Sequence, residues 1–292
     1  MLKQISLLIL CAVAIVFFAT PVHACTSAVV SGKVTPDGRP LLWKNRDTDF
    51  MRNHVDCVKG ERYDFIAVVN SANAYLKEAW MGTNSAGFAL MNTQSYNLVD
   101  VKGDEERGAA NGRVIYRALE VCATVEDFCH FLDTISKPSD IEANFGVIDA
   151  QGGAAMFEVD YYKYVMYDAN NPKDAPYGYI ARTNFSFAGK VNEGAGYVRY
   201  MEADQVLMKA SATGSITPQF IFNDLSRSFR NCMLDIDLRS GEYNRPQASG
   251  WFIDQDFIPR SSTSCSVVVQ GVKPGVKAEL TTMWTLLGYL PV

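Results

Sequence analysis

Cys25 is the residue of this chain best suited to covalent chemistry. It follows a segment with the parts of an export signal: Lys3, an apolar run from Ile5 to Phe18, and small residues up to Ala24. Cleavage after Ala24 would leave Cys25 first, with a nucleophilic thiol and a free α-amino group whose unperturbed pKa is roughly 7.7–8. We therefore expect residues 1–24 to be a signal peptide and the mature protein to be exported, periplasmic or secreted.

A charged run, Lys-Asn-Arg-Asp at 44–47, comes one predicted hairpin after Cys25. The β-branched stretch 25–34 and the apolar stretch 40–45 flank a Thr-Pro-Asp-Gly turn, so the second strand returns beside the nucleophile. Positive charge from Lys44 or Arg46 would stabilise a thiolate, and the Asp47 carboxylate would orient the α-amino group. The alternative is an ordinary charged turn at a strand end.

Two asparagines are placed at predicted strand ends. Asn92 closes the apolar run after Gly82-Thr83-Asn84-Ser85-Ala86-Gly87, and Asn184 follows Ala181-Arg182-Thr183. An asparagine amide can donate to an oxyanion, although asparagine is also common in turns for conformational reasons alone.

The order of these residues resembles that of the cysteine N-terminal nucleophile (Ntn) hydrolases. This group includes choloylglycine (bile salt) hydrolases, penicillin V acylases, acid ceramidase-like amidases and isopenicillin N acyltransferases. The shared order is a processed Cys-Thr-Ser, basic-Asn-x-Asp, Gly-x-Asn-x-x-Gly-(x)4-Asn and Thr-Asn before a helical segment. The resemblance spans most of the mature chain.

The resemblance implies roles for four residues. Cys25 would be the nucleophile and Asp47 the partner of its α-amino group. Asn92 would donate to the oxyanion, and Asn184 would orient the amino terminus or the substrate.

It also implies two basic residues. Lys44 takes the place of the family's first arginine, a departure that keeps the charge and loses the bidentate fork, for which Arg46 could compensate. The second family arginine matches Arg199, with Arg260 as the alternative. The alternative without a functional role is that Arg199 lies on the surface of a helix, with its aliphatic part packed against the protein.

The element pattern indicates an α+β protein with antiparallel sheets. Helical periods cover 112–135, 196–211 and 217–230, with a Thr124–Asp127 capping box in the first. Strands are expected at 64–70, 77–81, 88–92, 145–149, 154–160 and its continuation 161–167, 179–183, 264–272 and 278–287. The resemblance implies a four-layer αββα sandwich formed by one Ntn-hydrolase domain over 25–292.

Composition excludes several function classes. The formal net charge is −5 with no basic patch, so nucleic acid is not an expected partner. No second apolar run of spanning length follows the signal, so stable membrane insertion is not expected. Beyond residue 24 the cysteines are sparse, at 25, 57, 122, 129, 232 and 265, and match no common zinc spacing. Neither a metal nor an organic cofactor is expected.

The expected activity is hydrolysis of a linear non-peptide C–N amide through a thioester on Cys25. Acyl transfer to an amine acceptor would use the same acyl-enzyme. The substrate is a small-molecule amide, for which an N-acyl compound, a bile salt or a penicillin V-like molecule all remain open. A homo-oligomer is compatible with the sequence.

Two readings of another class depend on the same cysteine. Lipid attachment at Cys25 would make the chain a membrane-tethered binding lipoprotein, although His23 and the strand-like Thr26–Val34 argue against it. A Cys25 disulfide would suit a secreted binding module.

Overall fold

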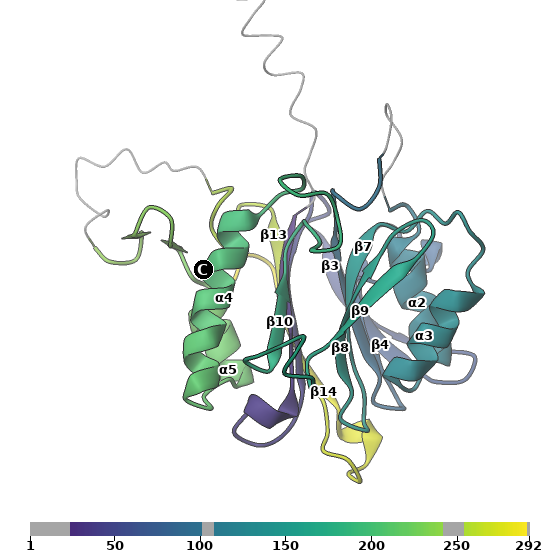
Figure 1. The fold of residues 1–292 in the computed structure, drawn as a ribbon. Coiled ribbons are helices and arrows are strands. Elements are labelled where there is room, and N and C mark those ends of the chain that lie inside the picture. Colours follow the sequence, from purple (N-terminus) through teal and green to yellow (C-terminus); the bar gives the residue numbers. More distant parts are fainter. Residues whose placement is uncertain (1–23, 101–107, 242–253, 291–292) are drawn as a thin grey trace, which may run out of the picture.

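The computed structural model describes residues 24–100, 108–241 and 254–290. Two antiparallel sheets lie face to face, with helices on both outer faces (Figure 1). This arrangement confirms the expected α+β, four-layer sandwich. The predicted signal segment lies outside the described residues apart from Ala24.

The first sheet has five strands, and its central hairpin begins at Cys25. In spatial order the strands are β10 (Tyr179–Arg182), β1 (Cys25–Val30), β2 (Leu41–Asp47), β13 (Thr263–Gln270) and β14 (Thr282–Leu287). All neighbours are antiparallel, and β1 pairs with β2 so that Cys25 lies opposite Arg46 and Ser27 opposite Lys44.

The second sheet has seven strands in simple sequence order. They are β3 (Asn53–Val58), β4 (Phe65–Asn70), β5 (Met81–Asn84), β6 (Ala89–Gln94), β7 (Ala143–Ile148), β8 (Ala154–Val159) and β9 (Tyr164–Asp168). A separate short pair consists of β11 (Arg230–Asn231) and β12 (Ile236–Asp237). Because each strand of the large sheet pairs with the next, short turns connect most of it.

The helices cover the two outer faces. The seven-stranded sheet is covered by α2 (Asn111–Val121) and α3 (Val125–Thr134). The five-stranded sheet is covered by α4 (Tyr197–Ala212) and α5 (Pro218–Phe220). Helix α5 continues in a π-helical turn, Ile221–Leu225. Short 3-10 turns occupy Gly32–Val34, Ala74–Leu76 and Ala278–Leu280. The predicted capping box is confirmed, since Thr124 and Asp127 exchange hydrogen bonds at the start of α3.

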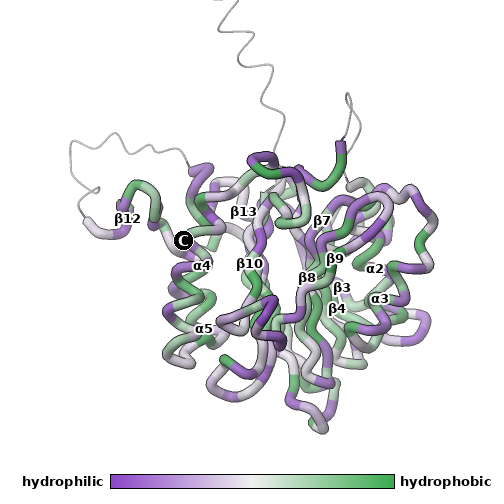
Figure 2. Tube along the Cα trace, viewed as in Figure 1, coloured by the Kyte–Doolittle hydropathy of each residue, from purple (hydrophilic) through white to green (hydrophobic). Residues whose placement is uncertain are grey.

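Alternating strand residues build three cores. Val29, Leu42 and Val269 pack between the sheets against Met91 and Met156, while their neighbours Val30, Trp43 and Val268 face α4. A third cluster joins the seven-stranded sheet to α2 and α3. Figure 2 shows hydrophobic residues recurring along the strands between the helical layers.

Several predicted boundaries are wrong. Lys77, expected in a strand, has a left-handed φ of 54°, and β5 begins only at Met81. Residues 161–167 do not continue β8, because a turn at 160–163 reverses the chain into β9. The helix expected over 217–230 ends at Leu225, β14 begins at 282 rather than 278, and β3 was not predicted.

Of the helices in the described ranges, none has the length and apolar character that a membrane span needs.

Candidate active site

The β1–β2 hairpin brings together three of the groups that could do chemistry. Opposed residues of antiparallel strands share a face, so the Cys25, Arg46 and Lys44 side chains lie on the face between the sheets. Asp47, one residue further, falls on the opposite pleat at the end of β2. Because Asp47 is the last residue of β2, it borders the same cavity as Cys25, Lys44 and Arg46 despite this alternation.

Both backbone polar groups of Cys25 are held by side chains from distant segments. Its N–H donates to Asn184 Oδ1 at 3.1 Å, and its carbonyl accepts from Arg199 Nη1 at 2.7 Å. Arg199 also donates to Thr26 Oγ1 at 2.9 Å and to Asn184 Oδ1 at 2.8 Å. Arg199 lies in the first turn of α4 and is only 1% exposed, so it is a buried residue and not a surface helix residue.

Asp47 lies in a buried pocket of donors. Thr263 Oγ1 donates to its Oδ1 at 2.6 Å, and an Arg260 nitrogen is 3.9 Å from its Oδ2. Oδ2 has no hydrogen-bond partner among the described residues. Burial raises the pKa of Asp47 to about 6, against the opposing pull of Arg199, Thr263 and Arg260.

Lys44 fixes the orientation of Asn92. The ammonium donates to Asn92 Oδ1 at 2.9 Å and to the Trp80 carbonyl at 3.1 Å. Because Oδ1 is occupied, the Asn92 Nδ2 group is the donor left for a ligand. Burial lowers the pKa of Lys44, while negative charge on Cys25 raises it. Asn92 lies within β6, two residues before its end, and not at the strand end as expected.

A cavity of about 380 Å³ opens beside these groups. Its apolar wall includes Phe50, Leu76 and Trp80. Polar and charged side chains line the rest: Cys25, Lys44, Arg46, Asp47, Thr48, Asn70, Asn73, Glu78, Asn92, Gln94 and Arg113. The volume lies in the range of small-molecule sites.

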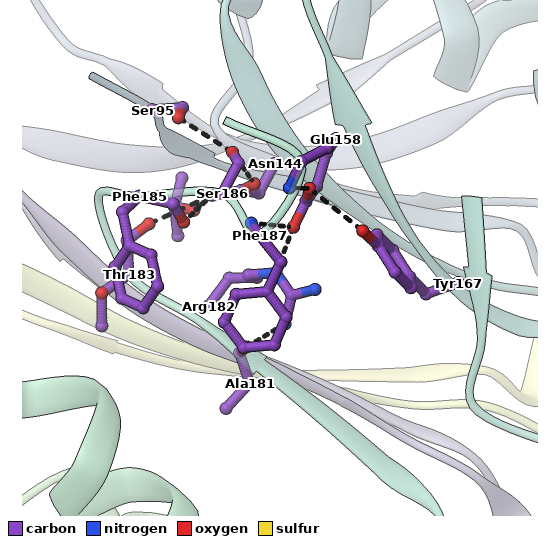
Figure 3. A network of polar contacts seen from close by, with 12 residues as sticks. Ser95, Asn144, Glu158, Tyr167, Ala181, Arg182, Thr183, Phe185, Ser186 and Phe187 are labelled. Carbon is purple, nitrogen blue, oxygen red and sulfur yellow. Dashed lines mark hydrogen bonds and ion pairs between the residues drawn. The ribbon is translucent and has the colours of Figure 1, made fainter. Parts of the chain in front are cut away.

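A buried network holds the loop that carries Asn184 (Figure 3). Glu158 on β8 accepts from Arg182 Nε at 2.7 Å and from the backbone N–H groups of Phe187 and Ala188 at 2.8 and 2.7 Å. Asn144 on β7 donates to the carbonyls of Thr183 and Phe185 at 3.2 and 3.1 Å. The seven-stranded sheet therefore positions a loop whose asparagine contacts the first residue of the other sheet.

The structure brings all six proposed site residues to one end of the sandwich. Cys25, Lys44, Asp47 and Asn92 line the cavity, while Asn184 and Arg199 contact Cys25 from outside it. Arg260, the alternative to Arg199, contacts Asp47 instead, so the two arginines hold different residues.

Sequence reasoning missed Thr263, Trp80, Asn53 and Asn70. Trp80 and Asn70 contact the Arg46 guanidinium, as does Asn53. An asparagine or threonine at a strand boundary carries little signal by itself, because turns favour the same residues.

Within the described ranges, no cluster of His, Cys, Asp or Glu could hold a metal ion, and the cysteines there are all free thiols.

A family model described as acyl-coenzyme A:6-aminopenicillanic acid acyl-transferase matches residues 34–214, more than half of the chain. No curated protein sequence gives a significant match.

Solved structures with a similar fold include a Caenorhabditis elegans N-acylethanolamine-hydrolyzing acid amidase ortholog. It is 14% identical, with a TM-score of 0.50 over 90% of this chain and 100% of that one. A conjugated bile acid hydrolase from Clostridium perfringens is 14% identical, with a TM-score of 0.46 over 92% of this chain and 94% of its own. A penicillin V acylase from Agrobacterium tumefaciens is 13% identical, with a TM-score of 0.42 over 90% and 82%. The chain belongs to the acyl-coenzyme A:6-aminopenicillanic acid acyl-transferase family and has the fold of the Ntn hydrolases.

Proposed function

We propose that this chain, once export has removed the residues before Cys25, is a cysteine amidase that hydrolyses linear non-peptide C–N amides. One observation carries the proposal: Cys25 borders the cavity while Asn184 and Arg199 fix its backbone nitrogen and carbonyl. A residue held in this way at the start of a buried strand is suited to act through its own α-amino group.

The first half-reaction transfers the acyl group to sulfur. The α-amino group takes the thiol proton as Sγ attacks the amide carbonyl carbon. Asn92 Nδ2 donates to the developing oxyanion, and the nearby charge of Lys44 stabilises it. The α-amino group then gives its proton to the leaving nitrogen, the C–N bond breaks, and a thioester remains.

The second half-reaction restores the enzyme. Water attacks the thioester carbonyl while the α-amino group takes one of its protons. The C–S bond breaks, the carboxylic acid leaves, and the proton returns to sulfur. No metal or redox step is required by this scheme.

Asn184 and Asp47 are proposed to hold the released α-amino group. Asn184 Oδ1 already accepts from the Cys25 nitrogen, and Asp47 has an oxygen without a hydrogen-bond partner in the described chain. An amine has more protons to donate than the peptide N–H present before cleavage. Release of Cys25 thus creates a donor that this acceptor pair can take.

Acyl transfer is the second candidate, and the family description favours it. It would differ only in the group that attacks the thioester, an amine in place of water. A product assay with and without added amines distinguishes the two.

The structure supports a catalyst over a lipid anchor or a disulfide at Cys25. Cys25 is 7% exposed and is paired within the sheet from its first residue, whereas a tether requires a free terminus. Its thiol is free in the described chain.

Cys25→Ser tests the proposal on the exported protein, with Cys57→Ser, which replaces an exposed thiol outside the cavity, as the matched control. We expect Cys25→Ser to lose amide hydrolysis while its free energy of unfolding stays that of the wild type. We expect Cys57→Ser to keep amide hydrolysis. Full activity in Cys25→Ser, or a lipid adduct in the intact mass of the active protein, would reject the mechanism. A form retaining one residue before Cys25 should be inactive, because an amide nitrogen is no base.

A further inference from the structure

Arg46 is a buried cation that the proposed reaction does not use as an acid, base or oxyanion donor. Its side chain crosses from β2 to the other sheet, where Nη2 donates to Asn70 Oδ1 at 2.9 Å and Nη1 donates to Asn53 Oδ1. The guanidinium carbon lies 4.7 Å from the centroid of the Trp80 ring. Two amides and an aromatic face thus fix its position at the cavity wall.

None of these contacts neutralises its charge. Among the described residues, no carboxylate forms an ion pair with Arg46, which is only 4% exposed. Burial lowers the pKa of Arg46, and negative charge on Cys265, Cys25 and Asp47 raises it in that order, so Asp47 is the smallest of these influences. Asp47 forms its own contacts with Thr263 and Arg260. A buried guanidinium without a countercharge is costly, since desolvation is not repaid by an opposite charge.

Other arginines near the cavity already have partners for their charge or their donors. Arg113 forms an ion pair with Glu78 at 3.5 Å. Arg199 donates hydrogen bonds to Cys25, Thr26 and Asn184. Arg46 has five N–H donors, of which the described hydrogen bonds use two. It can therefore accept a planar anion from the cavity.

We propose that Arg46 is an anion subsite that binds a carboxylate of the substrate close to the scissile amide. The inference rests on the proposed function, because Arg46 lies directly opposite Cys25 in the β1–β2 register. Directly opposed residues have Cβ atoms about 4.5–5.5 Å apart, so one small molecule can contact both side chains.

The distribution of apolar and charged side chains around the cavity indicates the rest of the substrate. Phe50, Leu76 and Trp80 offer an apolar wall, while Lys44 and Arg46 make the end near Cys25 cationic. An apolar acyl chain on the wall and an acid next to the amide describe an N-acyl amino acid. A carboxylate on the acyl group is the other source of the same chemistry.

Matched substrates separate these sources. N-acylglycine is compared with the N-acylglycinamide of the same acyl chain, and glutaryl-p-nitroanilide with pentanoyl-p-nitroanilide. We expect wild-type kcat/KM to favour the acidic member of at least one pair by about tenfold to hundredfold, chiefly through KM, as befits a charged hydrogen-bonded contact. The preferred pair identifies the side that bears the acid.

Arg46→Met should abolish that preference. The acidic substrate should lose about tenfold to hundredfold more in kcat/KM than its neutral partner, whatever loss the two share, and Arg46→Lys should retain part of the preference because it keeps the charge without the fork. Equal losses on both substrates, or a wild-type enzyme indifferent to the acid in both pairs, would overturn the subsite.

Binding separates this inference from the proposed function. Calorimetry on Cys25→Ala, with and without Arg46→Met, compares the acidic and neutral members of each pair without turnover. A preference for the acid that depends on Arg46 would support the subsite even if the wild-type protein hydrolyses nothing, an outcome that would reject the amidase alone. No difference in binding and none in turnover would reject the subsite.

Discussion

Two arginines cross from the five-stranded sheet to the seven-stranded sheet, and they meet different partners. Arg182 on β10 reaches Glu158 on β8 at 2.7 Å, and its guanidinium also stacks 4.0 Å from the Phe187 ring centroid. Arg46 on β2 donates to the amide oxygens of Asn53 and Asn70, and its guanidinium carbon lies 4.7 Å from the Trp80 ring centroid. Both side chains are buried, at 2% and 4% exposure.

The difference separates a structural charge from an available one. Glu158 neutralises Arg182 and takes two backbone N–H groups, which leaves the pair closed to a ligand (Figure 3). Arg46 and Lys44 lie beside a cavity, and in the described chain the acceptors of their hydrogen bonds are neutral. A buried cation with its countercharge holds the fold together, and one without it can bind or stabilise negative charge.

The largest effect is expected from opening the closed pair. Glu158→Ala leaves Arg182 buried without a countercharge and the N–H groups of Phe187 and Ala188 without acceptors. We expect the free energy of unfolding, measured in urea, to fall by about 3–5 kcal/mol. Glu158→Gln, which keeps an acceptor oxygen, should lose less. If Glu158→Ala has the same free energy of unfolding as the wild type, the Arg182–Glu158 pair has no structural role.

The next effect is a pH dependence at Asp47. Its pKa rises on folding from 3.8 to about 6, so between those values the folded chain holds a proton that the unfolded chain has released. The free energy of unfolding should therefore fall as pH rises from about 4 to about 6 and level off above, by roughly 2–3 kcal/mol in all.

The chain with Ala24 attached is the form to measure, because a new α-ammonium would change the surroundings of Asp47. Asp47→Asn should lack this slope. If the same slope persists in the variant, another group causes it.

The smallest of the three effects concerns Lys44 and is catalytic. Lys44→Met removes a charge and the hydrogen bond that orients Asn92, so kcat/KM should fall about tenfold to hundredfold. The free energy of unfolding should change by only about 1 kcal/mol, because relief of the buried charge offsets two lost hydrogen bonds. Lys44→Arg should keep most of the activity. A loss of stability like that of Glu158→Ala would make Lys44 structural and break the contrast.

The candidate site residues were named from the order of short motifs, which resembles that of a known family, and one part of their arrangement is a local pattern. The hairpin that returns Lys44 and Asp47 to Cys25 needs only two apolar strands and a turn, and the structure forms it with Cys25 opposite Arg46. The capping box of α3 is equally local. The boundaries of helices and strands were predicted less well where tertiary contacts decide them. Examples are the start of β5 at Met81 and the π-helical turn, which ends at Leu225, before the predicted helix end.

The partners of each charge depended on contacts that no local pattern records. Arg199 and Arg260 could not be assigned from sequence, because their targets, Cys25 and Asp47, are far along the chain and adjacent only after the sheets and α4 pack. In the sequence, Lys44 and Arg46 are likewise equivalent as positive charges near Cys25. In the structure, Lys44 donates to Asn92 and Arg46 donates to Asn53 and Asn70, all on the opposite sheet.

The sequence by itself therefore determined the chemical groups, their order along the chain, and the α+β class with antiparallel sheets, because strand alternation and helical period are local properties of the chain. The four layers were expected from the family resemblance. Only the tertiary structure decided which charges are neutralised and which face the cavity, because an ion pair such as Arg182–Glu158 forms between strands of different sheets.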